Sequence, residues 1–185
     1  MAIKIILADS AGVCFGVEKA VSSAESELKS SKRVSSYGPL IHNPQSIEKL
    51  EKQGLNVINE INNQKGTIII RAHGITIDEE SKLNSNESKV VDMTCPIVKR
   101  LQFAVKALTE ESYHVIIVGD YNHPEIIGAK SYGNNNVSVI QSIEDIKKLR
   151  ITTKKIGIVA QTTIPVENFW EVVNEFKKNK ELDIK

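Results

Sequence analysis

Residues 66–78 read GTIIIRAHGITID, a short β-branched run followed at once by a turn and the start of a helix. Three consecutive isoleucines, Ile68 to Ile70, are typical of a strand buried on both faces of a parallel sheet. Gly74 ends the run, and Thr76 or Asp78 can cap the first exposed N–H groups of a helix. The stretch therefore predicts a strand–turn–helix unit with His73 at the carboxyl end of the strand.

Comparable junctions recur along the whole chain. The predicted strands are residues 2–8, 34–40, 66–71, 89–93, 114–118 and 155–160, and helices are predicted near 17–28, from 44, from 76 or 78, at 97–108 and at 165–176. Residues 119–128 are predicted as a polar loop. Alternating strands and helices indicate an α/β fold with mostly parallel sheets. A boundary at Cys95 would give halves of similar size, so we predict two small parallel-sheet βα domains, 1–95 and 96–185.

Composition limits the classes of function. The 185 residues are 41% hydrophobic and 25% charged, which is ordinary for a soluble globular protein. Lys and Arg number 24 against 23 for Asp and Glu, so the net charge of +1 offers no footprint for a nucleic-acid backbone. The apolar run at the start is too short for a signal peptide, and no stretch approaches the roughly 18 residues of a membrane span. We therefore expect a cytoplasmic protein with no nucleic-acid or membrane partner.

The two cysteines, Cys14 and Cys95, each precede a predicted helix. Cytosolic thiols stay reduced, and unpaired N–H groups at a helix start favour the thiolate, so both are candidates for metal or sulfide binding. The alternative is that each is a small buried residue of a turn. Two thiolates alone do not complete a zinc or iron–sulfur site.

Three histidines also follow predicted strands: His42, His73 and His123. Ligands bind at the carboxyl edge of parallel sheets, and histidines beside helix starts can donate to phosphate oxygens. A diphosphate would suit this set, although each histidine alone is as well explained by a capping or surface role. The fourth, His114, begins a predicted strand and is interpreted as structural.

Two further side chains are candidates for chemistry. Glu125 lies two residues after His123 in the sequence. It can deliver a proton if a closed pocket raises the pKa of its carboxyl group. Thr162 and its neighbour Thr163 can orient a substrate hydroxyl, or they can simply cap the following helix.

The set of junctions resembles the 4-hydroxy-3-methylbut-2-enyl diphosphate (HMBPP) reductase family, also called LytB or IspH. Six short motifs match in order: Ala11-Gly12-Val13-Cys14-Phe15-Gly16-Val17, His42-Asn43, Ala72-His73-Gly74, Thr94-Cys95-Pro96, His123-Pro124-Glu125 and Gln161-Thr162-Thr163. Six motifs in sequence are far more specific than any one of them.

The resemblance implies an enzyme of non-mevalonate isoprenoid biosynthesis that reduces HMBPP to isopentenyl and dimethylallyl diphosphates. It implies that Cys14 and Cys95 bind irons of a [4Fe–4S] cluster, and that the three histidines at 42, 73 and 123 bind the diphosphate. Thr162 would contact the hydroxyl region of the substrate and Glu125 would supply protons. Ferredoxin or flavodoxin would donate the electrons, and three α/β domains would surround the central cluster.

The chain departs from the family pattern in one respect. The family uses three cysteines, and its third domain supplies the last one together with a Ser-x-Asn motif, neither of which occurs before Lys185. We therefore expect the first two of three domains, inactive and largely cluster-free by themselves. Two alternatives remain: a diphosphate-binding or interaction module without redox activity, and a zinc site formed by Cys14, Cys95 and a histidine. Oligomeric state and the relative orientation of the domains are not predicted by the sequence.

Overall fold

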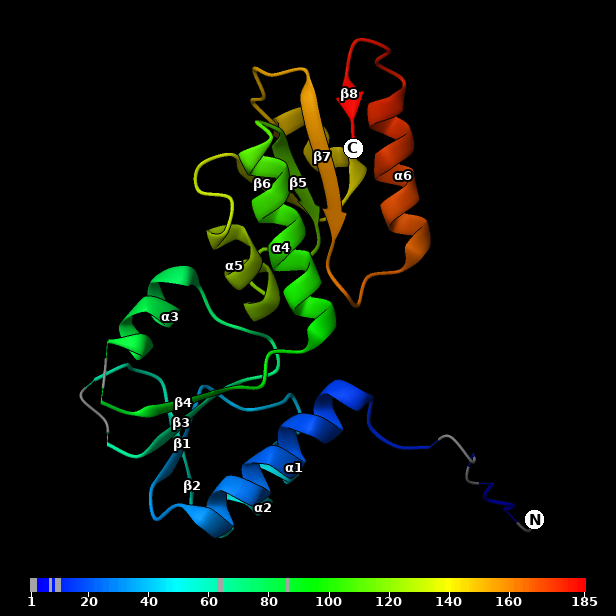
Figure 1. Cartoon of the computed structure of the whole chain (residues 1–185). Coiled ribbons are helices and arrows are strands. Elements are labelled where there is room, and N and C mark those ends of the chain that lie inside the picture. Colours follow the sequence, from blue (N-terminus) through cyan, green and yellow to red (C-terminus); the bar gives the residue numbers. More distant parts are fainter. Residues whose placement is uncertain (1–2, 7, 9–10, 63–64, 86) are drawn as a thin grey trace.

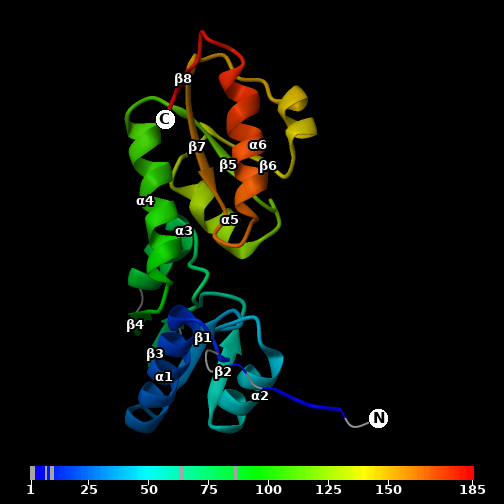
Figure 2. The ribbon, with the colours of Figure 1, turned by 90° about the vertical axis from the view of Figure 1, so that its right-hand side faces the viewer.

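Two parallel four-stranded sheets, each with helices on both faces, form the chain. The computed structural model describes residues 3–6, 8, 11–62, 65–85 and 87–185. The two sheets and their helices are stacked end to end, with helices α3 and α5 beside the junction (Figures 1 and 2). The predicted α/β fold is confirmed. Within the described part of the chain, no helix is long and apolar enough to cross a membrane.

The first sheet has the strand order β2-β1-β3-β4, and all neighbouring strands are parallel. Its strands are β1 (Val34–Tyr37), β2 (Leu55–Ile58), β3 (Thr67–Ile70) and β4 (Lys89–Asp92). Helices α1 (Phe15–Ser30) and α2 (Pro44–Lys52) pack on one face through Ala20, Ala24 and Leu50. Helix α3 (Ile77–Asn84) covers the other face with Leu83. Strand β3 is buried at all four positions, as its isoleucine run predicts.

The second sheet repeats this arrangement with the order β6-β5-β7-β8. Its elements are α4 (Pro96–Glu110), β5 (His114–Val118), α5 (Pro124–Ser131), β6 (Val137–Ile140), the 3-10 helix η1 (Ile143–Lys148), β7 (Lys155–Ala160), α6 (Val166–Lys177) and β8 (Asp183–Ile184). Alternate residues of β5 separate its two cores. Val115 and Ile117 pack with α4 and α5, whereas Ile116 and Val118 pack with α6.

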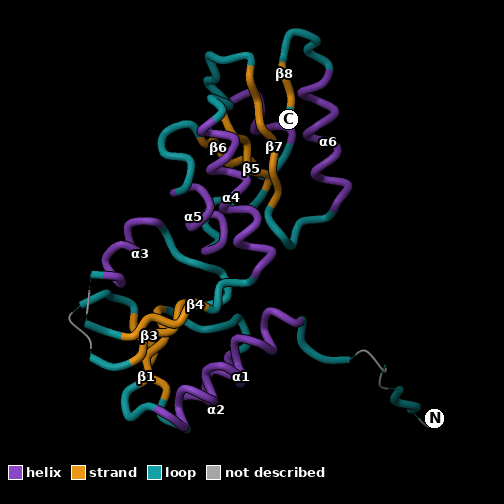
Figure 3. Tube along the Cα trace, in the orientation of Figure 1, coloured by secondary structure: helices purple, strands orange, loops and turns teal. Residues whose placement is uncertain are grey.

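The two halves share one topology. Replacing β1, β2, β3 and β4 by β5, β6, β7 and β8 converts one strand order into the other, and each half opens with a long helix (Figure 3). Cys14 is the N-cap residue of α1 and Cys95 that of α4. The two cysteines therefore occupy corresponding positions, as the sequence predicts.

The predicted strand at residues 2–8 is wrong where it is described. Residues 3–6 belong to no sheet, and the segment leads away from the first sheet (Figure 1). Ile3 and Ile5 are 88% and 89% exposed, so the apolar run has no neighbouring strand to complete its backbone hydrogen bonds. Residues 2 and 7 lie outside the described residues.

The predicted loop at residues 119–128 is also wrong in its second half. Pro124 begins helix α5, with His123 as its N-cap residue. Proline suits the first helical position because its missing N–H would be unpaired there in any case. Three short strands, β2, β6 and β8, were not predicted, and the last has only two residues.

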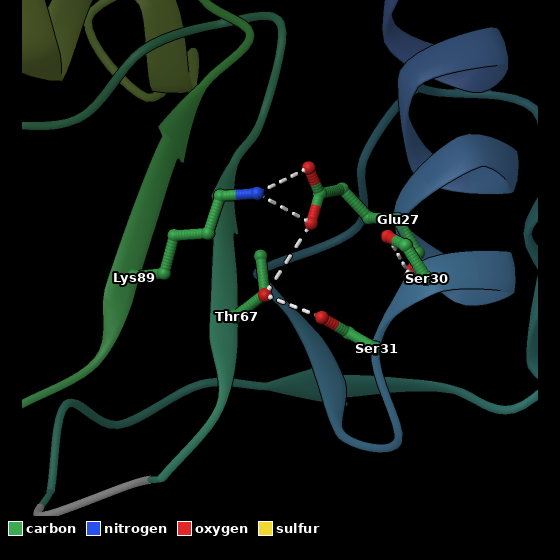
Figure 4. Close-up of polar contacts among 5 residues, drawn as sticks. All are labelled: Glu27, Ser30, Ser31, Thr67 and Lys89. Carbon is green, nitrogen blue, oxygen red and sulfur yellow. Dashed lines mark hydrogen bonds and ion pairs between the residues drawn. The ribbon is translucent and has the colours of Figure 1, made fainter.

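At the amino ends of β3 and β4, a polar network joins α1 to the first sheet (Figure 4). Glu27 accepts two hydrogen bonds from Lys89 Nζ on β4, at 2.7 and 2.9 Å. Thr67 Oγ1 on β3 lies 3.4 Å from the same carboxylate and 3.2 Å from Ser31 Oγ. The Glu27 side chain is only 16% exposed, so this pair is better shielded than a fully exposed ion pair.

We predict that Glu27→Ala lowers the free energy of unfolding by roughly 1 kcal/mol, because it removes a shielded ion pair and one partner of the buried Thr67. Urea denaturation measures this value. The matched control is Glu48→Ala, which breaks the exposed Lys52–Glu48 pair on α2 and should cost no more than about 0.5 kcal/mol. Equal losses in the two variants would contradict the prediction.

Candidate functional site

The turns after β1, β3 and β4 are held side by side by backbone hydrogen bonds that continue past the strands. Ala72 N donates to Leu40 O at 3.2 Å, and Cys95 N donates to Ala72 O at 2.9 Å. His42 and His73 follow Leu40 and Ala72 closely in sequence. The carboxyl edge of the first sheet therefore gathers two histidines and one cysteine, as expected for parallel strands.

The three predicted histidines meet in what we call the histidine triangle: His42, His73 and His123. The ring centroids of His42 and His73 are 4.0 Å apart, and that of His123 lies 5.4 Å and 5.6 Å from them. The first two rings come from the first sheet, and the third comes from the turn after β5. The triangle therefore crosses the junction between the halves.

A backbone hydrogen bond in the turn at His123 determines which nitrogen of its ring can donate. His123 Nδ1 accepts a hydrogen bond from Glu125 N at 3.2 Å, which caps α5. A neutral ring that accepts at Nδ1 carries its proton on Nε2. Nε2–H is then the donor that this ring can offer to an anion.

Burial and the repulsion between neighbouring basic groups lower the pKa values of His42 and His73. Burial, followed by the neighbouring His42, His123 and Arg71, lowers the pKa of His73 to about 4. Burial, His123 and Arg71 lower the pKa of His42 as well. A bound anion would oppose these effects, since it favours the protonated form of each ring.

Glu125 lies beside the triangle and is 2% exposed. Thr162 N donates to Glu125 Oε1, and Thr162 Oγ1 donates to Oε2, both at 2.8 Å. The structure thus joins the acid of the turn after β5 to the hydroxyl of the turn after β7. His114, in contrast, bonds to Ser138 on the neighbouring strand β6 at 2.9 Å, which agrees with its structural interpretation.

The sequence assigned no role to two side chains at the site, although one of them, Gln161, belongs to the last of the six motifs. Gln161, 7% exposed, accepts from Asp120 N and donates to Thr163 Oγ1, each at 2.9 Å, so it ties the two turns of the second sheet together. Arg71 adds positive charge near His42 and His73. Gln161 adjoins the threonine pair in sequence, and Arg71 ends the isoleucine run, but neither residue type alone indicates a role.

The cysteines lie at the starts of α1 and α4, and neither makes a side-chain cap hydrogen bond. Cys14 is exposed and Cys95 is partly buried. A Cβ atom on Gly16 would stand 2.9 Å from Cys95 Sγ, so this sulfur rests on the first turn of α1, two residues after Cys14. Two thiols at helix starts suit part of an iron–sulfur ligand set.

The proposed zinc alternative finds no support in the described residues. Among them, no group of three or more His, Cys, Asp and Glu side chains is arranged to hold a metal ion. A different feature adjoins the triangle: a groove of about 590 Å³ beside His42, whose apolar lining includes Val13, Val17 and Ile41. An anion held by the histidines would therefore have an apolar surface next to it.

Comparison with known proteins identifies the family. The model of the LytB protein family matches residues 5–185. The reductase of Pelobacter propionicus, named 4-hydroxy-3-methylbut-2-enyl diphosphate reductase, is 43% identical over 173 residues, covering 93% of this chain and 61% of the relative. The Aquifex aeolicus protein of the same name is 44% identical over 178 residues, covering 94% of this chain and 61% of its own length.

Solved structures agree with the sequence comparison. A structure described as (E)-4-hydroxy-3-methyl-but-2-enyl diphosphate reductase, the terminal enzyme of the non-mevalonate pathway, matches with a TM-score of 0.84 at 41% identity, covering 98% of this chain and 66% of that one. The Plasmodium falciparum reductase matches with a TM-score of 0.88 at 27% identity, covering 96% and 57%. The chain spans about 61% of the length of the first curated relatives. By sequence and by fold, this chain belongs to the LytB protein family.

Proposed function

We propose that this chain forms the first two α/β domains of a cytoplasmic HMBPP reductase, with the boundary between Cys95 and Pro96. The observation that carries the proposal is the histidine triangle, built from both halves beside two cysteines at corresponding helix starts. The relatives that share this fold are named for this reaction. Since the chain spans about 61% of them, a third domain would complete the enzyme.

In this proposal the triangle binds the diphosphate of HMBPP. Three imidazoles around one point can each donate to a phosphate oxygen, and His123 offers Nε2–H because its Nδ1 is already occupied. The N–H groups at the start of α5 add to the positive potential there. The apolar groove beside His42 gives the ligand a non-polar neighbour.

Glu125 and Thr162 would serve the departing hydroxyl. Converting HMBPP to isopentenyl or dimethylallyl diphosphate consumes two electrons and two protons and releases one water. A hydroxyl leaves far more readily as water, so an acid must protonate it. Thr162 Oγ1 donates to Glu125 Oε2. Once Glu125 is protonated, its carboxyl O–H would donate to Thr162 Oγ1 instead, and the hydroxyl proton of Thr162 would pass to the substrate oxygen.

Cys14 and Cys95 would hold two irons of a [4Fe–4S] cluster, with the third protein ligand supplied by the rest of the family's length. When bound, the cluster supplies the two electrons, which we propose it receives from ferredoxin or flavodoxin. Gly16 would keep the space between the two cysteines open, because any side chain there would press on Cys95 Sγ.

The first prediction concerns binding of inorganic diphosphate by this chain, measured by calorimetry. Because the pKa values of His42 and His73 are lowered in the free protein, a bound anion must raise them, so binding takes up protons. The dissociation constant should therefore fall on the order of tenfold between pH 8 and pH 6. His73→Asn should weaken binding and flatten this dependence, whereas His114→Asn should change neither. Undetectable binding by the unmodified chain would contradict the proposed function.

A second prediction tests the Glu125–Thr162 pair. Thr162→Val removes the hydroxyl that bonds Oε2 of a buried carboxyl, and should lower the free energy of unfolding by about 1–3 kcal/mol. Thr162→Ser keeps the hydroxyl and is the matched control. Thermal denaturation of the two variants decides the matter, and equal midpoints would rule out a structural bond between these groups.

A third prediction concerns the cluster. After anaerobic treatment with iron and sulfide, we expect this chain to retain far less than one cluster per molecule and to leave HMBPP unreduced, since two thiolates do not complete a cubane site. Iron and sulfide analysis with an HMBPP reduction assay measures both quantities. A stable stoichiometric cluster with turnover would refute the two-domain proposal.

A further inference from the structure

The histidine triangle depends on a contact that joins the two halves. His73 belongs to the turn after β3, whereas His123 caps helix α5 of the second half. Their ring centroids are 5.6 Å apart, so a small shift of one half against the other would open the triangle. What fixes this distance is therefore part of the site.

The contact is made by backbone, because Gly128 presents no side chain to the carbonyl group of Ile75. A Cβ atom on Gly128 of α5 would lie 3.2 Å from Ile75 O and 3.5 Å from its carbonyl carbon. Gly128 lies five residues after His123, and Ile75 lies two residues after His73. Helix α5 thus touches the His73 turn without any intervening side chain.

A buried amide fills the space beside this contact. Gln102 on α4 is 2% exposed, although the other inward residues of that helix are apolar. Its Nε2 would stand 2.6 Å from a Cβ on Gly74 and 3.6 Å from one on Gly128. Gly74 also has a φ of +75°, which favours glycine for a second reason.

Further polar contacts continue along the same junction. Ile77 N donates to Ser131 Oγ at 3.1 Å, and Tyr132 OH donates to Glu80 Oε2 at 3.3 Å. Behind them, Asp92 and Lys99 pair across the start of α4. The side chains of Glu80, Asp92, Lys99, Gln102 and Tyr132 line a cavity of only about 10 Å³, so this inner part of the junction is closely packed. Its outer part, at Ile77 and Ser131, borders an open groove of about 400 Å³.

We propose that Gln102 and Gly128 are positioning residues that fix the two halves as one body and thereby set the distance between His73 and His123. Only the expected effect on diphosphate binding rests on the proposed function; the effect on the distance between the two rings does not. Both residues act through the turn that carries His73 and the helix that His123 caps.

The test uses nuclear Overhauser effects between histidine ring protons in the ligand-free chain. His42 and His73 both come from the first half, so their cross-peak is an internal reference that a junction variant should leave unchanged. Gly128→Val places side-chain atoms against Ile75 O and should abolish the His73–His123 cross-peak, and Gly128→Ala should weaken it. Gln102→Ala should weaken it too. Lys130→Val puts the same residue type at an exposed position of α5 and should preserve all cross-peaks.

Diphosphate binding provides the second measurement. Gly128→Val should raise the dissociation constant at least about tenfold, while Lys130→Val leaves it within twofold. A His73–His123 cross-peak of unchanged intensity in both Gly128 variants would overturn the proposal. Failure of the unmodified chain to bind diphosphate would instead refute the proposed function, and the ring cross-peaks would still decide whether the junction positions the histidines.

Discussion

Close approach of backbone at Gly128 and Ile75 is the constraint on which the rest of the site depends. Each sheet by itself delivers its polar side chains to its own carboxyl edge, but an anion site for several imidazoles needs both edges to meet. Side chains between α5 and the His73 turn would hold the edges apart. Glycine at this position therefore does what no apolar packing residue can, since it lets helix and turn touch directly.

The topology that the two halves share explains how a few turns bring all the candidate site residues together. In each half a cysteine is the N-cap residue of the first helix, and a histidine follows the first strand just before a helix that begins with proline: Pro44 in α2 and Pro124 in α5. The turn after the third strand carries His73 in one half and Thr162 in the other. Because the halves use one strand order, their corresponding turns bring different side chains to equivalent places. One half offers an imidazole ring for the proposed anion binding where the other offers a hydroxyl for the proposed proton transfer.

The sequence predicts strands well where burial on both faces demands β-branched residues, as at 67–70 and 114–118, whose isoleucines and valines admit little else. The prediction fails where a strand forms only if a neighbouring strand is available to pair with it. Ile3 to Ile6 have the same composition as a strand, but a strand forms only against another edge, and composition does not reveal where that edge lies. Likewise, the cluster of His42, His73 and His123 follows from their shared position after strands. The proposed roles of Gln102 and Gly128 could not be predicted from the sequence. One buried amide and one helical glycine form no periodic pattern or motif, and their contacts lie across the junction between the halves.

The basic side chains at the histidine triangle suit the anion site that is proposed there. Arg71 lies near His42 and His73, and burial together with the neighbouring positive groups lowers the pKa values of these two rings. The carboxyl group of Glu125, which is 2% exposed, accepts two hydrogen bonds from Thr162. If Glu125 paired with a protonated histidine, that pair would neutralise the positive potential for the diphosphate proposed to bind here, and it would hold the proton that Glu125 is proposed to supply. The Glu125 carboxyl bonds to Thr162 instead, which would keep the proposed anion binding and the proposed proton supply apart.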